Sequence, residues 1–137
     1  MKKEEKELLQ KGFNVAALLG GGDSLQVWVD FNTEIRVKLR HISREEMATI
    51  TRKATVSEFV NHQKREKLDD LKYGELIGLA AIADWSGLVL GDEPFPCTPE
   101  NIKLLMLKWG DFAKFISDFS TDFERLVAAE KEAERKN

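Results

Sequence analysis

The chain has 137 residues, of which 42% are hydrophobic and 33% charged, a balance typical of one folded domain and too apolar for a disordered protein. No run approaches the ~20 apolar residues that a membrane span requires, and the charged N-terminus lacks the apolar core of a signal peptide. The single cysteine, Cys97, excludes an intrachain disulfide and a multi-cysteine zinc site. We therefore expect a cytoplasmic protein.

The net charge of −3 is unevenly distributed along the chain. Residues 1–35 contain 4 Lys/Arg and 6 Asp/Glu, which gives a charge of −2. Residues 36–67 contain 9 and 4, which gives +5, whereas residues 68–137 contain 8 and 14, which gives −6. This asymmetry predicts a homo-oligomer in which the basic segment of one copy faces the acidic half of another.

Residues 1–24 form a charged lead-in that ends in the glycine-rich loop at residues 20–23. Because no Lys-Ser/Thr pair follows these glycines, we interpret them as a turn and not as a phosphate-binding loop. The remaining residues, 25–137, are expected to form a single α+β domain.

Two runs of alternating polarity, separated by Asn32 and Thr33, predict a β-hairpin at the start of this domain. The apolar side chains of its inner face are Leu25, Val27, Val29, Phe31, Ile35, Val37 and Leu39. The outer face is basic and carries Arg36, Lys38 and Arg40. Trp28 is an apolar side chain on this polar face and is therefore a candidate contact with a partner.

Helix signals follow the hairpin. Ser43 and Glu46 have the spacing of a capping box, which predicts a helix that ends before Thr55. The Thr55–Ser57 region can cap a second helix, which would continue through His62. Leucines and alanines at helical spacing predict a further buried helix over residues 69–83.

Two turn signals in residues 84–96 predict an irregular or short β connection. Thr98 and Pro99 then have the pattern of a helix start, with a buried stripe formed by Ile102, Leu105, Met106 and Trp109. A last helix is predicted after Gly110, followed by a frayed, charged tail over residues 130–137. Its apolar stripe comprises Phe112, Phe115, Ile116, Phe119, Phe123, Leu126 and Val127. The expected fold is the hairpin packed with about four or five helices.

No pattern of catalytic or metal-ligating residues is present. His41 and His62 are the only histidines, and neither lies at a metal-ligand spacing from Asp, Glu or Cys. A nucleophilic pair with Cys97 would require one of them to approach that thiol through the fold. We expect a non-enzymatic protein without a cofactor or a bound metal.

The order of several segments is more distinctive than any one of them. A basic strand runs into VKLRHISREEMATITRKAT, and ADWSGL, PFPCTPENIKLLM, an aromatic helix and a charged tail follow. Over residues 25–137 this order resembles the tail assembly chaperones of long-tailed bacteriophages and prophages. The matching elements are the Arg40–Glu46 junction, the Trp85 and Gly87 pair, and the Thr98–Asn101 helix start. An alternative for Trp85 and Gly87 is a core tryptophan beside a turn glycine.

The resemblance implies a cytoplasmic protein of infected or lysogenic bacteria that binds the tape-measure protein, keeps it soluble and helps to recruit the major tail protein. Candidate partner-binding residues are Trp28, Arg36, Lys38, Arg40, Trp85, Trp109, Phe112, Phe115, Phe119 and Phe123. The alternative hypothesis is a small nucleic-acid-binding regulator that uses the basic segment 36–67 to contact phosphates. The acidic C-terminal half opposes a polyanion, so nucleic acid is the less expected partner.

Overall fold

The computed structural model describes residues 15, 19 and 25–136, so most of the expected lead-in and its glycine loop lie outside the described residues. The described chain combines five helices with three small antiparallel sheets, which confirms the α+β class. The largest sheet contains β1 (Gln26–Asp30), β2 (Arg36–Arg40) and β5 (Ile82–Ser86) in the order β1-β2-β5.

The predicted N-terminal hairpin is confirmed, with Val27 opposite Leu39 and Val29 opposite Val37. Its turn depends on Asn32, whose Oδ1 accepts hydrogen bonds from the backbone N–H groups of Glu34 (2.9 Å) and Ile35 (2.8 Å). An asparagine side chain that bonds the backbone two and three residues ahead stabilises the reversal of the chain.

The third strand, β5, was not predicted as part of this sheet. Helix α4 (Asp70–Ala81) ends two residues earlier than expected, and the chain continues directly as β5 beside β2. Trp85 lies opposite Val37, and both side chains are buried. Because β2 is therefore the central strand, the basic residues Arg36, Lys38 and Arg40 lie in the middle of the sheet.

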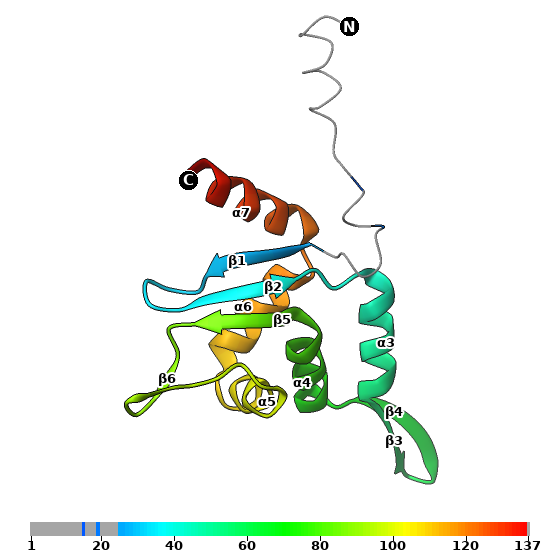
Figure 1. Cartoon of the computed structure of the whole chain (residues 1–137). Coiled ribbons are helices and arrows are strands. Elements are labelled where there is room, and N and C mark those ends of the chain that lie inside the picture. The colour runs from blue at the N-terminus through cyan, green and yellow to red at the C-terminus, as the bar shows by residue number, and fades with distance from the viewer. Residues whose placement is uncertain (1–14, 16–18, 20–24, 137) are drawn as a thin grey trace, which may run out of the picture.

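Helices α4 and α6 (Gly110–Ser120) pack against the inner face of this sheet, and α7 (Phe123–Lys136) lies along β1 (Figure 1). Helix α5 (Pro99–Lys108) packs closely on α4 at Gly78, where an added Cβ would lie 2.5 Å from Met106 Cγ. The core lies between the sheet and these helices, and none of the described helices lies over the outer face of the sheet.

Helix α3 (Arg44–Ala54) begins and ends where the sequence predicts. The Ser43 hydroxyl accepts a hydrogen bond from the Glu46 N–H (3.1 Å), and Glu46 Oε1 accepts one from the Ser43 N–H (3.4 Å). Both halves of the capping box are therefore present, and two free N–H groups at the helix start are satisfied.

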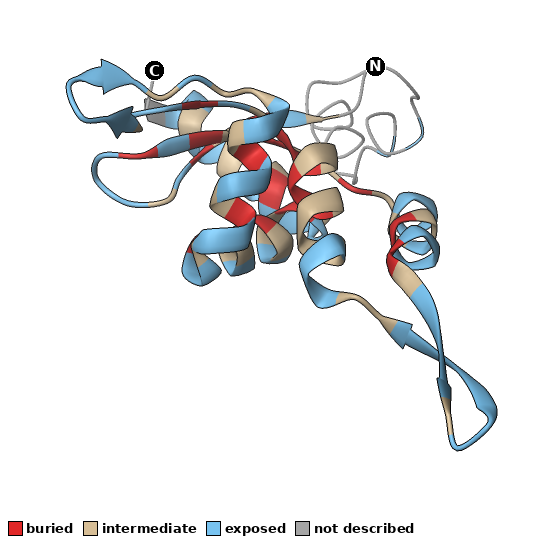
Figure 2. Ribbon diagram, turned by 90° about the horizontal axis from the view of Figure 1, so that it is seen from below, coloured by how far each residue is buried: buried red, intermediate tan, exposed pale blue. Residues whose placement is uncertain are grey.

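The prediction of a second helix after Thr55 is wrong. The segment forms a two-stranded hairpin of β3 (Thr55–Val60) and β4 (Gln63–Leu68), which projects from the body with almost every residue exposed (Figure 2). Asn61 and His62 form its two-residue turn with positive φ angles of 53° and 65°, which match the twist of a hairpin. Thr55, Val56, Phe59 and Val60 favour a strand over a helix, which is the local reason for the difference.

The start of α5 is confirmed, because the Thr98 hydroxyl accepts a hydrogen bond from the Asn101 N–H (3.2 Å) and Pro99 occupies the first helical position. The single last helix is instead two helices, α6 and α7. Asp122 separates them, since its Oδ1 accepts a hydrogen bond from the Arg125 N–H (3.1 Å) and caps the new helix. Helix α7 then continues to Lys136, where a frayed tail was expected. The short strands β6 (Val89–Leu90) and β7 (Glu93–Pro94) fit the predicted β connection.

Candidate interaction surfaces

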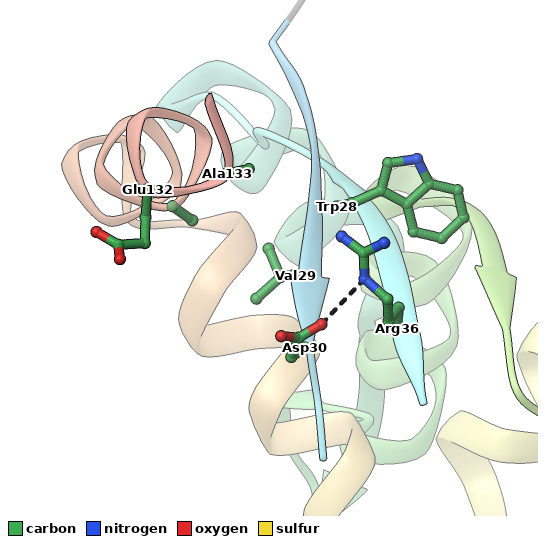
Figure 3. A pocket seen from close by; sticks show the side chains of 7 residues that line it. Trp28, Val29, Asp30, Arg36, Glu132 and Ala133 are labelled. Carbon is green, nitrogen blue, oxygen red and sulfur yellow. Dashed lines mark hydrogen bonds and ion pairs between the residues drawn. The ribbon is translucent and has the colours of Figure 1, made fainter. Parts of the chain in front are cut away.

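Trp28 lies on the outer face of the sheet as predicted, but it is half-buried by neighbouring side chains. The Arg36 guanidinium carbon lies 5.6 Å from the centre of the indole ring. The Arg36 Nε also donates to Asp30 Oδ1 at 3.0 Å, so this arginine joins the ring and the carboxylate (Figure 3). The charge of Arg36 is therefore partly neutralised before any partner binds.

A cavity of about 500 Å³ opens between β1 and α7 beside this cluster (Figure 3). The small side chains of Ala129 and Ala133 form its helical wall, and Glu132 lies at its rim. Trp28 and Arg36 are the two predicted partner-binding residues that this cavity brings together.

The other two cations of the outer face have different environments. Lys38 lies between Trp28 of β1 and Asp84 of β5 in the strand register. The Arg40 Nη1 donates a hydrogen bond to the Ala80 carbonyl at 3.2 Å, so Arg40 ties the sheet to the end of α4. A phosphate that bound Arg40 would therefore have to compete with the Ala80 carbonyl for the guanidinium.

The basic segment 36–67 does not form one continuous surface. Its first three cations lie on β2. The next three lie on α3 and are Arg44, Arg52 and Lys53. The last three lie on the projecting β4 strand and are Lys64, Arg65 and Lys67 (Figure 1). On that hairpin, Glu58 lies directly opposite Arg65. The positive charge is thus distributed over three elements and interrupted by acids.

Phe31, directly after β1, is the centre of an aromatic cluster with Trp109 and with Phe112 and Phe115 of the predicted stripe. The Phe31 ring centroid lies 5.1 Å from Trp109, 5.5 Å from Phe112 and 5.0 Å from Phe115, in edge-to-face geometry. Such contacts stabilise beyond the area they bury. The cluster therefore fixes α6 against the sheet.

Two of the candidate partner-binding residues are core residues. Phe112 is 0% exposed and Trp85 is 7% exposed. The Trp85 indole N–H donates to the Phe95 carbonyl at 2.7 Å, and its ring stacks on Phe95. These two side chains are unavailable to a partner, and the packing alternative holds for Trp85. Four further aromatic candidates are half-buried, namely Trp109, Phe115, Phe119 and Phe123.

Several large apolar side chains of residues 25–136 are exposed, and all but Leu71 are ones that the sequence pattern did not single out. Leu71 (61% exposed) was expected to be buried as part of the helix over residues 69–83, and that expectation is wrong. The others are Val56 (43% exposed), Phe59 (76%), Val89 (67%), Leu90 (70%), Leu104 (47%) and Leu107 (41%). A signal existed for two of them, because Leu104 and Leu107 lie three residues apart and off the buried stripe of their helix. A helix with leucines on two faces indicates a second contact surface.

A groove of about 480 Å³ separates α3 from α4. Its apolar lining comes from Ile50 on α3 and from Leu76, Leu79 and Ala80 on α4. The polar residues of the rim are Glu45, Glu46, Thr49 and Lys53, all on α3. This arrangement of an apolar floor and a charged rim is typical of sites that bind an amphipathic helix.

Burial lowers the pKa of His41, against the opposing effect of the backbone Ser120 carbonyl, which its Nδ1 contacts at 3.1 Å. The pKa of the Cys97 thiol is raised to about 11, chiefly by burial and then by the Asp84 carboxylate. Both shifts favour the neutral side chains at pH 7, which fits structural roles.

We expect alkylation of Cys97 by iodoacetamide at pH 8 to be roughly 100-fold slower in the folded chain than in the urea-unfolded chain. The pKa of about 11, against an ordinary value of 9.0, lowers the reactive thiolate fraction by about that factor. Mass spectrometry of timed samples measures the two rates. Asp84→Asn is expected to accelerate the folded reaction only modestly, and equal rates for folded and unfolded chains would contradict the burial.

Among the residues that the structure describes, no group of three or more His, Cys, Asp or Glu side chains is placed to hold a metal ion. None of the described helices has both the length and the apolar character of a membrane span. Comparison with known proteins finds no matching family model, no matching curated protein and no matching solved structure.

Proposed function

We propose that this chain is a non-enzymatic tail assembly chaperone of a long-tailed bacteriophage or prophage. It binds the tape-measure protein in the host cytoplasm and helps to recruit the major tail protein. The order of segments in residues 25–137 carries the proposal. The apolar side chains that remain exposed on well-formed helices support it, since a chaperone for long amphipathic helices must offer apolar contacts.

Self-association is part of the same proposal. The basic segment 36–67 and the acidic half of the chain are complementary between copies, and repeated head-to-tail contacts generate a ring or an open helix. Either arrangement aligns several copies along one long client. Charge complementarity would orient the copies and accelerate their encounter, while apolar contacts would supply most of the affinity.

Co-expression tests the chaperone function directly. We expect the tape-measure protein encoded beside this chain to be insoluble when expressed alone and soluble when co-expressed with it, because its apolar helix faces are then covered. The two chains are expected to co-elute from a sizing column. A tape-measure protein that stays equally insoluble, with no complex on the column, would refute the proposal.

Nucleic-acid binding is expected to be weak, because the cations of residues 36–67 are distributed over several elements and the C-terminal half carries −6. Fluorescence titration of labelled duplex DNA and RNA at ~50 mM salt measures the affinity. A sub-micromolar dissociation constant that rises steeply with added salt would instead favour the regulator hypothesis, since counterion release has that signature.

A further inference from the structure

The outward face of α5 is apolar and exposed. Ile102 and Met106 on its inner face pack on α4, whereas Leu104 and Leu107 are 47% and 41% exposed. Glu100 lies at one end of this exposed face and Lys108 at the other. The face therefore has two leucines one turn apart, between an acid and a base.

The groove between α3 and α4 has the complementary arrangement. Its apolar floor lies between Glu45, at the start of α3, and Lys53, in the last turn of that helix. The two charges of the groove are eight residues apart, as are Glu100 and Lys108. At 1.5 Å per residue, each pair spans about 12 Å of helix. Placed antiparallel to α3, helix α5 would set Lys108 beside Glu45 and Glu100 beside Lys53.

These four charged side chains are exposed, and none of them forms an ion pair with another described residue. Each helix also carries the charges that suit its own dipole, with the acid in the first turn and the base in the last turn. An antiparallel pairing of such helices opposes unlike charges at both ends. Both surfaces are thus available and electrostatically matched.

The α3–α4 groove and the exposed face of α5 cannot contact each other within one copy of the chain. Helix α4 lies between α3 and α5 and packs against both (Figure 1), so α5 does not lie in the α3–α4 groove of its own copy. A contact between them must join two copies. Because the two surfaces differ, the contact is heterologous, and each copy retains a free groove or a free α5 face for the next.

We propose that the α3–α4 groove of one copy binds the exposed face of α5 from a second copy. The inference specifies the contact for the self-association included in the proposed function, and it rests on that part alone. Leu104 and Leu107 fill the apolar floor, and the Lys108–Glu45 and Glu100–Lys53 pairs set the direction of the helix.

Two variants of the full chain separate the two sides of the contact. Leu104→Ser/Leu107→Ser removes the apolar face of α5 and keeps the groove, whereas Thr49→Trp obstructs the groove and keeps α5. Both changes are at partly or fully exposed positions, and circular dichroism verifies the fold. Leu90→Ser, at an exposed leucine of β6, is the matched control.

Sedimentation velocity across a concentration series measures assembly. The native chain and Leu90→Ser are expected to form oligomers, and the leucine variant is expected to weaken each contact on the order of 30-fold, as loss of two partly buried leucines predicts. An equal mixture of the leucine and tryptophan variants is expected to yield a 1:1 dimer and nothing larger, because one intact groove and one intact α5 face remain. Lys108→Glu should weaken assembly, and adding Glu45→Lys should restore it.

Oligomers of both variants indistinguishable from those of the native chain would refute this contact and leave self-association in place. A native chain that is monomeric at ~200 μM would refute self-association itself, while co-expression tests client binding separately. If Thr49→Trp abolishes binding of the tape-measure protein and leaves assembly unchanged, the groove binds a client helix, and the proposed contact between copies is wrong.

Discussion

Replacing Phe112 with alanine is expected to lower the free energy of unfolding by about 3–5 kcal/mol. The side chain is 0% exposed, and its ring centroid lies 5.5 Å from that of Phe31 and 5.4 Å from that of Trp109. Removing it leaves a cavity between α6 and the end of β1 that the surrounding rings cannot close without moving the helix. Urea denaturation followed by circular dichroism measures the change, and Trp109, one of the three tryptophans, contributes to a fluorescence signal that reports partly on the same site.

Phe59→Ala is the matched control, because Phe59 is 76% exposed on the β3–β4 hairpin. Its effect on the free energy of unfolding is expected to stay within about 0.5 kcal/mol. Similar losses for the two variants would show that α6 does not pack on the sheet as described. A Phe112→Leu variant, which keeps most of the volume, should fall between them.

Gly87→Ala is expected to destabilise the fold by about 3 kcal/mol or more, the combined result of backbone strain and a steric clash. Gly87 follows β5 with a φ of +89°, where a side chain is strained. An added Cβ would also lie 1.9 Å from the backbone oxygen of Glu34, so the turn between β1 and β2 would have to move. Thermal unfolding is expected to shift to a lower midpoint by on the order of 10 °C.

Gly74→Ala is expected to stabilise the fold, the opposite of Gly87→Ala. Gly74 lies inside α4 with no heavy atom within 4 Å of an added Cβ, so alanine should raise the free energy of unfolding by about 0.5–1 kcal/mol. A Gly87→Ala variant as stable as the native chain would contradict the close approach of residue 87 to the β1–β2 turn. Comparing the two variants separates the effect of helix propensity, at Gly74, from the effect of strain and steric contact, at Gly87.

The sequence alone determined the elements whose signals lie within a few residues of one another. The alternating runs of β1 and β2, the capping box at Ser43 and Glu46, and the Thr98–Asn101 helix start all appear in the structure. In each case the stabilising hydrogen bonds or the apolar alternation involve neighbours in the chain. The α+β class and the basic residues of β2 followed from the same local patterns.

The β3–β4 hairpin and the break between α6 and α7 also had local signals, at Asn61 and Asp122. The hairpin is exposed on both faces and therefore lacks the apolar alternation by which a strand is recognised. The apolar pattern of α6 continues across the break into α7, which concealed the cap at Asp122. In both places a local feature decided the structure, namely the Asn61–His62 turn between strand-favouring residues and the Asp122 cap.

Only the tertiary structure placed β5 beside β2, buried Trp85 and Phe112, and left Leu104 and Leu107 exposed on α5. Which apolar side of a helix is covered depends on which other elements pack against it, and those elements come from distant parts of the chain. The same holds for the groove between α3 and α4, because the hairpin that separates the two helices in sequence does not separate them in space. Burial is a property of contacts between segments, so periodicity identified the apolar side chains but not the ones that remain free to bind a partner.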